Sequence, residues 1–106
     1  MAKFLSQSKY STDGLKGLLK EGATGRKEAI EKLISSVGGR IESFYYAFGD
    51  TDLFMICDMP DNASAVAASL IVNASGAATT TLTPLLTPDD VDAATKKTAD
   101  YRPPGK

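Results

Sequence analysis

The chain has 106 residues, of which 42% are hydrophobic and 24% are charged. This length predicts a single globular domain, which we place at residues 1–100, with an extended tail at 101–106. Twelve basic and thirteen acidic residues leave a net charge of -1, which gives no long-range attraction to nucleic acid or to anionic lipid. We therefore expect neither nucleic acid nor a membrane among the partners of the protein.

Several mechanisms are excluded by residue types that are scarce or missing. The chain has no histidine, which excludes an imidazole base, a histidine haem ligand and a mixed histidine–cysteine zinc site. The single cysteine, Cys57, excludes an internal disulfide, and its apolar neighbours predict a protonated thiol in the core. We expect no metal and no cofactor. Because no apolar run approaches the roughly 18 residues of a membrane span and the N-terminus lacks a signal-peptide core, we expect a cytoplasmic protein.

Hydrophobic periodicity and turn residues divide the chain into alternating strands and helices. In chain order we predict a strand at 3–9, a short helix or single turn around 15–19, a helix at 24–37, strands at 40–48 and 53–59, a helix from about 62 to 74, a strand at 78–83 closed by Pro84, and a short helix beginning at Pro88.

The helix at 24–37 has the clearest pattern, with Thr24 as its expected N-cap and a glycine pair at its end. Its apolar stripe, at positions i, i+3, i+4 and i+7, consists of Ile30, Leu33, Ile34 and Val37. In the later helix, capped by Asp61 or Asn62, we expect Val66, Leu70 and Ala74 to face the sheet.

The order strand, helix, strand, strand, helix, strand is typical of the split βαβ, or ferredoxin-like, arrangement. The predicted fold class is therefore α+β: a four-stranded antiparallel sheet with both helices on one face. Thr87 as a cap, Pro88 at the first helical position and acidic residues after it predict an extra C-terminal helix.

The sheet is predicted to be apolar on both faces, although its helices cover only one. Simple alternation separates the side chains of the strand at 40–48 into one set with Ile41, Ser43, Tyr45 and Ala47 and another with Glu42, Phe44, Tyr46 and Phe48. We expect an aromatic patch on the uncovered face, with Phe44 and Phe54 as the positions that test it. Self-association of two such faces would make a dimeric α+β barrel, a homodimer or a larger assembly built from it, with a small-molecule cavity between the sheets.

Several short motifs have an order and spacing that resemble a known family. They are Tyr10-Ser11-Thr12-Asp13-Gly14-Leu15-Lys16, Arg26, Gly38-Gly39-Arg40, Phe44-Tyr45, Gly49-Asp50-Thr51-Asp52, Met59-Pro60-Asp61, Gly76 and Tyr101-Arg102-Pro103-Pro104-Gly105. The chain resembles the GYD-domain proteins, small bacterial members of the dimeric α+β barrel superfamily. This resemblance implies the ferredoxin-like fold and the barrel assembly, and supplies no established reaction. Thr51 stands where the family turn usually has tyrosine.

Tyrosines and small hydroxyl residues are the first candidates for lining a pocket. Tyr45 or Tyr46 could project a phenol into the barrel cavity, but alternation allows only one of them to do so, and a core or interface aromatic is the more common role. Ser6, Ser8 and the threonines at 80 and 81 are candidates for polar lining, and threonine also simply suits a strand.

Charged residues give the remaining candidates. Asp50 and Asp52 lie two apart in a hairpin connection, where carboxylates can share a metal, but we favour hydrogen bonding to the turn backbone. Arg26 stands at the start of a helix, where it can bind an anion or pair with a neighbouring carboxylate, and we favour the ion pair.

The sequence supports two classes of function. The leading hypothesis is a homo-oligomeric barrel that binds a small molecule or serves as an assembly module, because no activated nucleophile, metal cluster or cofactor fingerprint is present. The second is a cofactor-independent oxygenase or isomerase acting on a small organic substrate, with Tyr45 or Tyr46 and Asp50 or Asp52 in one cavity. A tyrosine hydroxyl and a carboxylate converging in a closed cavity would favour the enzyme.

Overall fold

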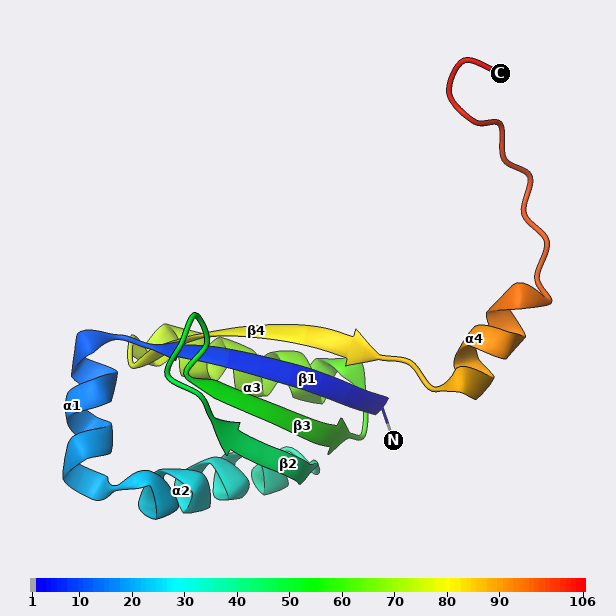
Figure 1. Ribbon diagram of the computed structural model, residues 1–106. Coiled ribbons are helices and arrows are strands. Elements are labelled where there is room, and N and C mark those ends of the chain that lie inside the picture. The colour runs from blue at the N-terminus through cyan, green and yellow to red at the C-terminus, as the bar shows by residue number, and fades with distance from the viewer. Residues whose placement is uncertain (1) are drawn as a thin grey trace.

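The computed structural model describes residues 2–106 and contains one four-stranded sheet (Figure 1). In chain order the elements are β1 (Ala2–Tyr10), α1 (Thr12–Glu21), α2 (Ala23–Ser36), β2 (Arg40–Tyr46), β3 (Leu53–Met59), α3 (Asn62–Ser75), β4 (Ala78–Leu85) and α4 (Pro88–Thr95). The sheet has the order β2-β3-β1-β4, and all three neighbouring pairs are antiparallel. The predicted α+β class and ferredoxin-like order are confirmed, as is the additional C-terminal helix.

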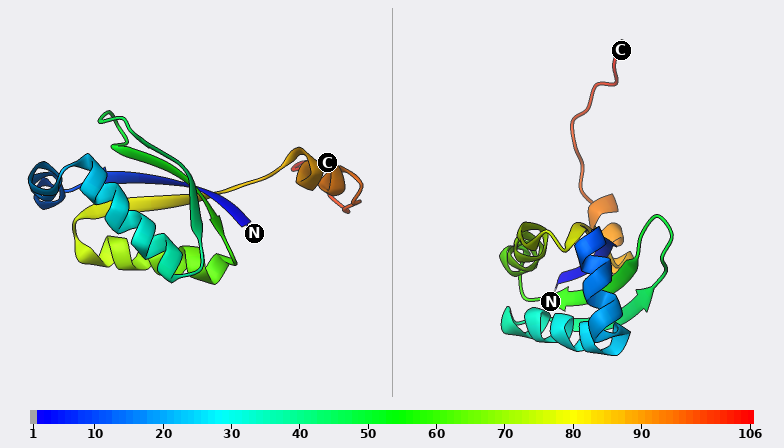
Figure 2. Two further views of the ribbon diagram at one scale, coloured as in Figure 1. Left: turned by 90° about the horizontal axis from the view of Figure 1, so that it is seen from below. Right: turned by 90° about the vertical axis from the view of Figure 1, so that its left-hand side faces the viewer.

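Helices α2 and α3 lie on the same side of the sheet, and the loop between β2 and β3 projects on the other side (Figure 2). Helix α2 packs on β2 and α3 packs on β4, so the two helices cover opposite edges of the sheet. Between them, the central strands β1 and β3 present the covered face. The buried core cluster on that face consists of Phe4, Ile34, Met55, Cys57, Met59, Ala65 and Ala68.

The alternation predicted along β2 is wrong because the strand contains a bulge. Ile41 pairs with Cys57 and Phe44 pairs with Met55, with a register shift between Ile41 and Ser43. The extra residue of a bulge reverses the alternation beyond it. Ile41, Phe44 and Tyr46 therefore all face the helices, and Phe44 packs against the core cluster instead of joining the uncovered face.

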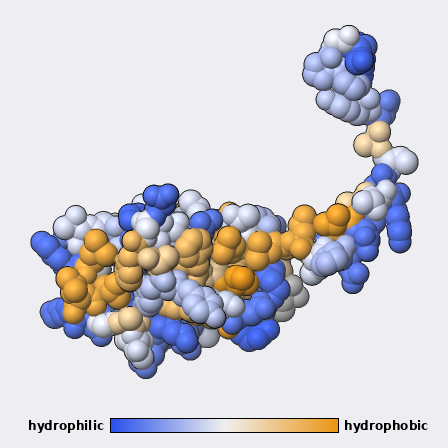
Figure 3. Space-filling view, viewed as in Figure 1, coloured by the Kyte–Doolittle hydropathy of each residue, from blue (hydrophilic) through white to orange (hydrophobic). Residues whose placement is uncertain are grey.

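The uncovered face, which we call the open face, carries a smaller aromatic set than we predicted. Tyr45 pairs with Phe54, and these side chains are 70% and 38% exposed. Leu5, beside Ile56 in the β1–β3 pair, continues the apolar surface. Figure 3 shows a hydrophobic band across this side of the molecule that runs toward the C-terminal arm.

Two helix starts differ from the sequence prediction. Helix α1 is a full ten-residue helix, because Ser11 caps it by accepting a hydrogen bond from Gly14 N at 3.1 Å. Helix α2 begins at Ala23, after Gly22 with φ of 83°, so Thr24 lies inside the helix and is not its cap. The left-handed backbone of Gly22 allows the sharp turn between the two helices.

The side of helix α3 that faces the sheet is not the side that the sequence predicted. The side chains buried against the sheet are Ala65 and Ala68, whereas Val66 and Leu70 are 48% and 63% exposed. The expected stripe of Val66, Leu70 and Ala74 is therefore wrong: Ala65 and Ala68 face the sheet, and Val66 and Leu70 face outward. Asp61 caps the helix, as one of the two predicted residues.

Strand β4 continues through Pro84, where the sequence predicted its end. Pro84 pairs with Phe4, and β4 is an edge strand with β1 as its one neighbour. A proline is tolerated there because its missing N–H can lie on the unpaired side of the strand. The chain then leaves the sheet and forms a C-terminal arm, α4 and the residues after it, that projects from the body (Figures 1 and 2).

Candidate functional site

A cavity of about 280 Å³ lies on the covered face of the sheet, between α2 and α3. We call it the helix-side cavity. Its floor is formed by β1, β3 and β4, and its walls include Leu33 from α2 and Ala68 and Val72 from α3. The cavity exists because the helices cover opposite edges of the sheet and α3 turns small side chains inward. The sequence hypothesis instead placed a cavity between two sheets, on the opposite face.

The cavity is partly open, and one of its ends is polar. Tyr10, at the end of β1, and Arg26, in the first turns of α2, both line it. The Tyr10 hydroxyl is buried and has no hydrogen-bond partner among the described residues. Burial raises the pKa of Tyr10 to about 12, so its hydroxyl stays protonated and can donate a hydrogen bond at neutral pH.

Arg26 forms an ion pair, but its buried Nε atom makes no hydrogen bond. Its Nε lies 3.0 Å from Glu21 Oε1, which confirms the predicted ion pair. The contact is an ion pair and not a hydrogen bond, however, and the buried Nε atom makes no hydrogen bond within residues 2–106. Two donors, one of them on a cation that is already ion-paired with Glu21, therefore lie at the same end of the cavity without a hydrogen bond.

A buried carboxylate fixes the backbone that carries Tyr10. Asp52 is 2% exposed, and its Oδ2 accepts a hydrogen bond from Tyr10 N at 2.9 Å. Its Oδ1 accepts from Lys9 Nζ at 3.0 Å. The backbone hydrogen bond from Tyr10, followed by the contact with Lys9, holds the pKa of Asp52 below its usual value. Asp52 thus has a structural role, but its backbone partner is Tyr10 at the end of β1 and not the hairpin turn that the sequence predicted; through this contact it positions the tyrosine.

Three of the four hydroxyl residues that we predicted to line a cavity between two sheets lie instead in the helix-side cavity. Ser6 and Ser8 are buried, and the Ser8 hydroxyl lies 3.0 Å from Thr80 Oγ1 across the β1–β4 pair. Thr81, the fourth, is exposed on the opposite side of β4. Cys57 is buried in the floor, and burial raises the pKa of its thiol, in agreement with the predicted protonated core cysteine.

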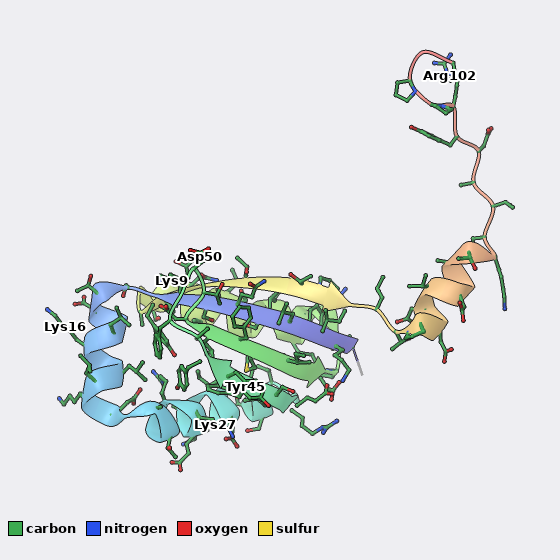
Figure 4. The ribbon with its side chains drawn as sticks, viewed as in Figure 1. Lys9, Lys16, Lys27, Tyr45, Asp50 and Arg102 are labelled. Atoms are coloured by element: carbon green, nitrogen blue, oxygen red, sulfur yellow. The ribbon has the colours of Figure 1, made fainter. Side chains whose placement is uncertain are left out.

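The two candidate tyrosines lie on opposite sides of the sheet, as alternation requires, and neither lines the cavity. Tyr46 Oη donates to Ala23 O at 3.0 Å at the start of α2, and burial raises its pKa. Tyr46 also packs edge to face against Phe44, with ring centroids 5.3 Å apart. Tyr45 stands on the open face (Figure 4).

The hairpin carboxylates do not converge on a cavity. Asp50 is exposed at the tip of the hairpin (Figure 4), and Lys9 beneath it donates to Gly49 O at 2.9 Å. Because Asp52 is engaged with Lys9 and the Tyr10 backbone, neither carboxylate meets a tyrosine hydroxyl in the helix-side cavity. Within residues 2–106, no group of three or more histidine, cysteine or acidic residues is arranged to hold a metal ion.

Sequence reasoning missed Tyr10, which it assigned to a turn. The signal was present, because Phe4, Ser6, Ser8 and Tyr10 alternate along one strand and must share a face. It also missed an ion-pair network on the open face. Asp58 accepts from Lys3 Nζ at 2.9 Å and from Arg40 Nη2 at 2.6 Å, and Lys3 also pairs with Glu42.

These features define a ferredoxin-like α+β domain with a pocket between its sheet and its two covering helices. The family model described as GYD domain matches residues 4–95, and the chain belongs to this family. No curated protein and no solved structure gives a significant match to the chain. None of the helices in the described part of the chain is both long and apolar enough to span a bilayer.

Proposed function

We propose that the protein binds a small, mainly apolar organic molecule in the helix-side cavity. The observation that carries this proposal is a cavity of about 280 Å³ that is predominantly apolar and has unpaired polar atoms at one end. Ligand sites in proteins commonly have volumes of about 300–1,000 Å³, apolar walls and a few placed polar groups. This cavity lies at the lower edge of that range, which favours a small ligand.

The interior of the cavity is suited to binding and offers little to catalysis. Its deep end is closed by Met59, Ile34 and Ala65, all of which are buried. Cys57 is a protonated thiol among apolar side chains, and neither hairpin carboxylate lines the walls. Binding therefore accounts for the arrangement better than the enzymatic hypothesis does.

The test is a titration with octanol, a neutral apolar probe, followed by NMR of the alanine and methionine methyl groups. We expect saturable shifts at Met55, Met59 and Ala68, which line the cavity. Ala68→Leu should abolish them by filling the space, and Ala74→Leu, an exposed position on the same helix, should not. Equal binding by both variants, or no saturable shift in the parent protein, would refute the proposal.

We also propose that the chain self-associates through the open face, as the dimeric barrel expectation requires. The support is the exposed pair of Tyr45 and Phe54, which continues into an apolar band on that face. Burying these side chains against a second copy removes apolar surface from water, which favours association.

Light scattering on Tyr45→Glu and Phe54→Glu tests this assembly. Both should shift the mass toward the monomer, because a charge would be buried in the interface. Thr24→Glu, which adds the same charge on the exposed first turn of α2, is the matched control. A parent protein that is monomeric, or variants with unchanged mass, would argue against the open face.

A further inference from the structure

We propose that the ligand of the helix-side cavity is a small monocarboxylate whose anionic end is held by the Tyr10 hydroxyl and Arg26. This inference rests on the proposed binding function and names the chemical class of the ligand. Its basis is two buried donor atoms at one end of the cavity that make no hydrogen bond within the described residues: Tyr10 Oη, and Arg26 Nε, which is ion-paired with Glu21.

Unpaired buried donors are costly, since a buried polar group without a partner loses its hydration and gains no hydrogen bond in exchange. A ligand that places acceptor oxygens at this end of the cavity would give both donors a hydrogen-bond partner. A carboxylate fits better than a neutral oxygen, because arginine donates its strongest hydrogen bonds to anionic oxygens. The Glu21 contact does not take this role, as it is half-exposed and leaves the Nε hydrogen unpaired.

The rest of the cavity favours a ligand that carries a single charge. Its deep walls are apolar, with Met59, Ile34 and Ala65 at the far end. Between the two ends, the hydroxyls of Ser6, Ser8 and Thr80 are the polar groups of the floor, and they are neutral. A dicarboxylate or a phosphate dianion would bring a second charge without a second cation, so a monoanion with an apolar body is favoured.

The volume limits the size of that body. An engineered apolar cavity of about 150 Å³ accepts benzene, which has six carbon atoms. In proportion, a cavity of about 280 Å³ accepts roughly eleven non-hydrogen atoms. Octanoate and simple aromatic carboxylates fall within this limit, and hexadecanoate exceeds it.

Calorimetric titration with octanoate and octanol, at neutral pH, separates anion recognition from apolar binding. We expect octanoate to bind the parent protein at least about tenfold more tightly than octanol, because hydrogen bonds to charged groups strengthen binding by about this factor or more. Hexadecanoate should bind more weakly than octanoate.

Two variants assign the effect to the named groups. Arg26→Met, which keeps an unbranched apolar stem, should weaken octanoate about tenfold or more and leave octanol within about threefold. Tyr10→Phe removes only the hydroxyl and should weaken octanoate in the same direction. Lys27→Met removes an equal charge from the next residue of α2, outside the cavity, and should leave both affinities unchanged.

The outcomes distinguish this inference from the proposed function. If octanol binds as tightly as octanoate, or if Arg26→Met weakens both probes equally, anion recognition is wrong and apolar binding stands. If neither probe binds the parent protein, both proposals fail. Because the comparison of octanoate with octanol is made on the parent protein, it decides the question even where a variant folds poorly.

Discussion

Helix α1 lies close to the backbone of Ala77 at Gly14, and a methyl group there should destabilise the fold. A Cβ on Gly14 would lie 2.0 Å from Ala77 O and 3.1 Å from the Tyr10 ring. The obstruction is a backbone oxygen, which cannot rotate away, so the start of α1 must move by more than an ångström. Ala77 O accepts hydrogen bonds from Ser11 N at 2.9 Å and Ser11 Oγ at 3.1 Å, and this movement breaks both.

The expected loss of stability follows from those two hydrogen bonds. Two hydrogen bonds contribute about 1–3 kcal/mol to the free energy of unfolding. The higher helix propensity of alanine returns up to about 1 kcal/mol, which leaves a net loss of up to about 2 kcal/mol for Gly14→Ala. Gly17→Ala, three residues along the same helix, meets nothing within 4 Å and should gain about 0.5–1 kcal/mol.

Urea and thermal unfolding of the two variants measure this difference directly. For a domain of this size the gap corresponds to a difference in Tm on the order of 10 °C. The two variants have the same composition, so general effects of an added methyl group cancel. A Gly14→Ala protein as stable as Gly17→Ala would refute the reasoning and would mean that α1 does not pack on Ala77 in solution.

Three further substitutions test the site. The pKa of Tyr10 is raised from 10.0 to about 12, so the stability that its protonated hydroxyl contributes is fully present below pH 10 and is lost as the pH rises toward 12. Over this range the free energy of unfolding, measured with urea, should fall by about 1–2 kcal/mol more in the parent than in Tyr10→Phe. Asp52→Asn should cost about 1–3 kcal/mol at pH 7, with the difference shrinking below about pH 4 because the parent carboxylate, whose pKa is lowered, then protonates as well; a difference independent of pH would contradict its ionised role. Ala68→Leu should stabilise the protein by about 1–2 kcal/mol because its added carbons enter empty space, and a loss of stability would show that the cavity is closed in solution.

Much of the fold could be predicted because local signals and tertiary packing agree. The glycines after α2, the Asp61 cap and the Thr87-Pro88 start of α4 all act within a few residues, and each marks a boundary that the structure confirms within a residue or two. The strand order follows from the chain order. Pro84 misled the prediction of β4 because its tolerance depends on which strand is at the edge, and that is a property of the whole sheet.

The candidate site was predictable only in part, because it depends on which face each side chain takes. A single bulge between Ile41 and Ser43 turns Phe44 toward the helices and leaves Tyr45 on the open face. No residue near the bulge signals it, and two-residue periodicity fails beyond it. Ser6 was predicted to line a cavity between two sheets and lies instead in the helix-side cavity, whereas Arg26 was correctly assigned to an ion pair; their meeting in one cavity depends on the spacing of α2 and α3.

The rotation of α3 about its own axis determines both which side chains line the cavity and which lie on the outer surface. Had Val66 and Leu70 faced the sheet, as their hydrophobicity predicts, they would have filled the space that Ala65 and Ala68 leave. Because both side chains point outward and remain about half-exposed or more, the isolated chain buries less apolar surface than it would with the predicted rotation. A packed core alone would not favour this rotation. It is explained if the space is used by a ligand, which is why the stability and the binding affinity of Ala68→Leu should change in opposite directions.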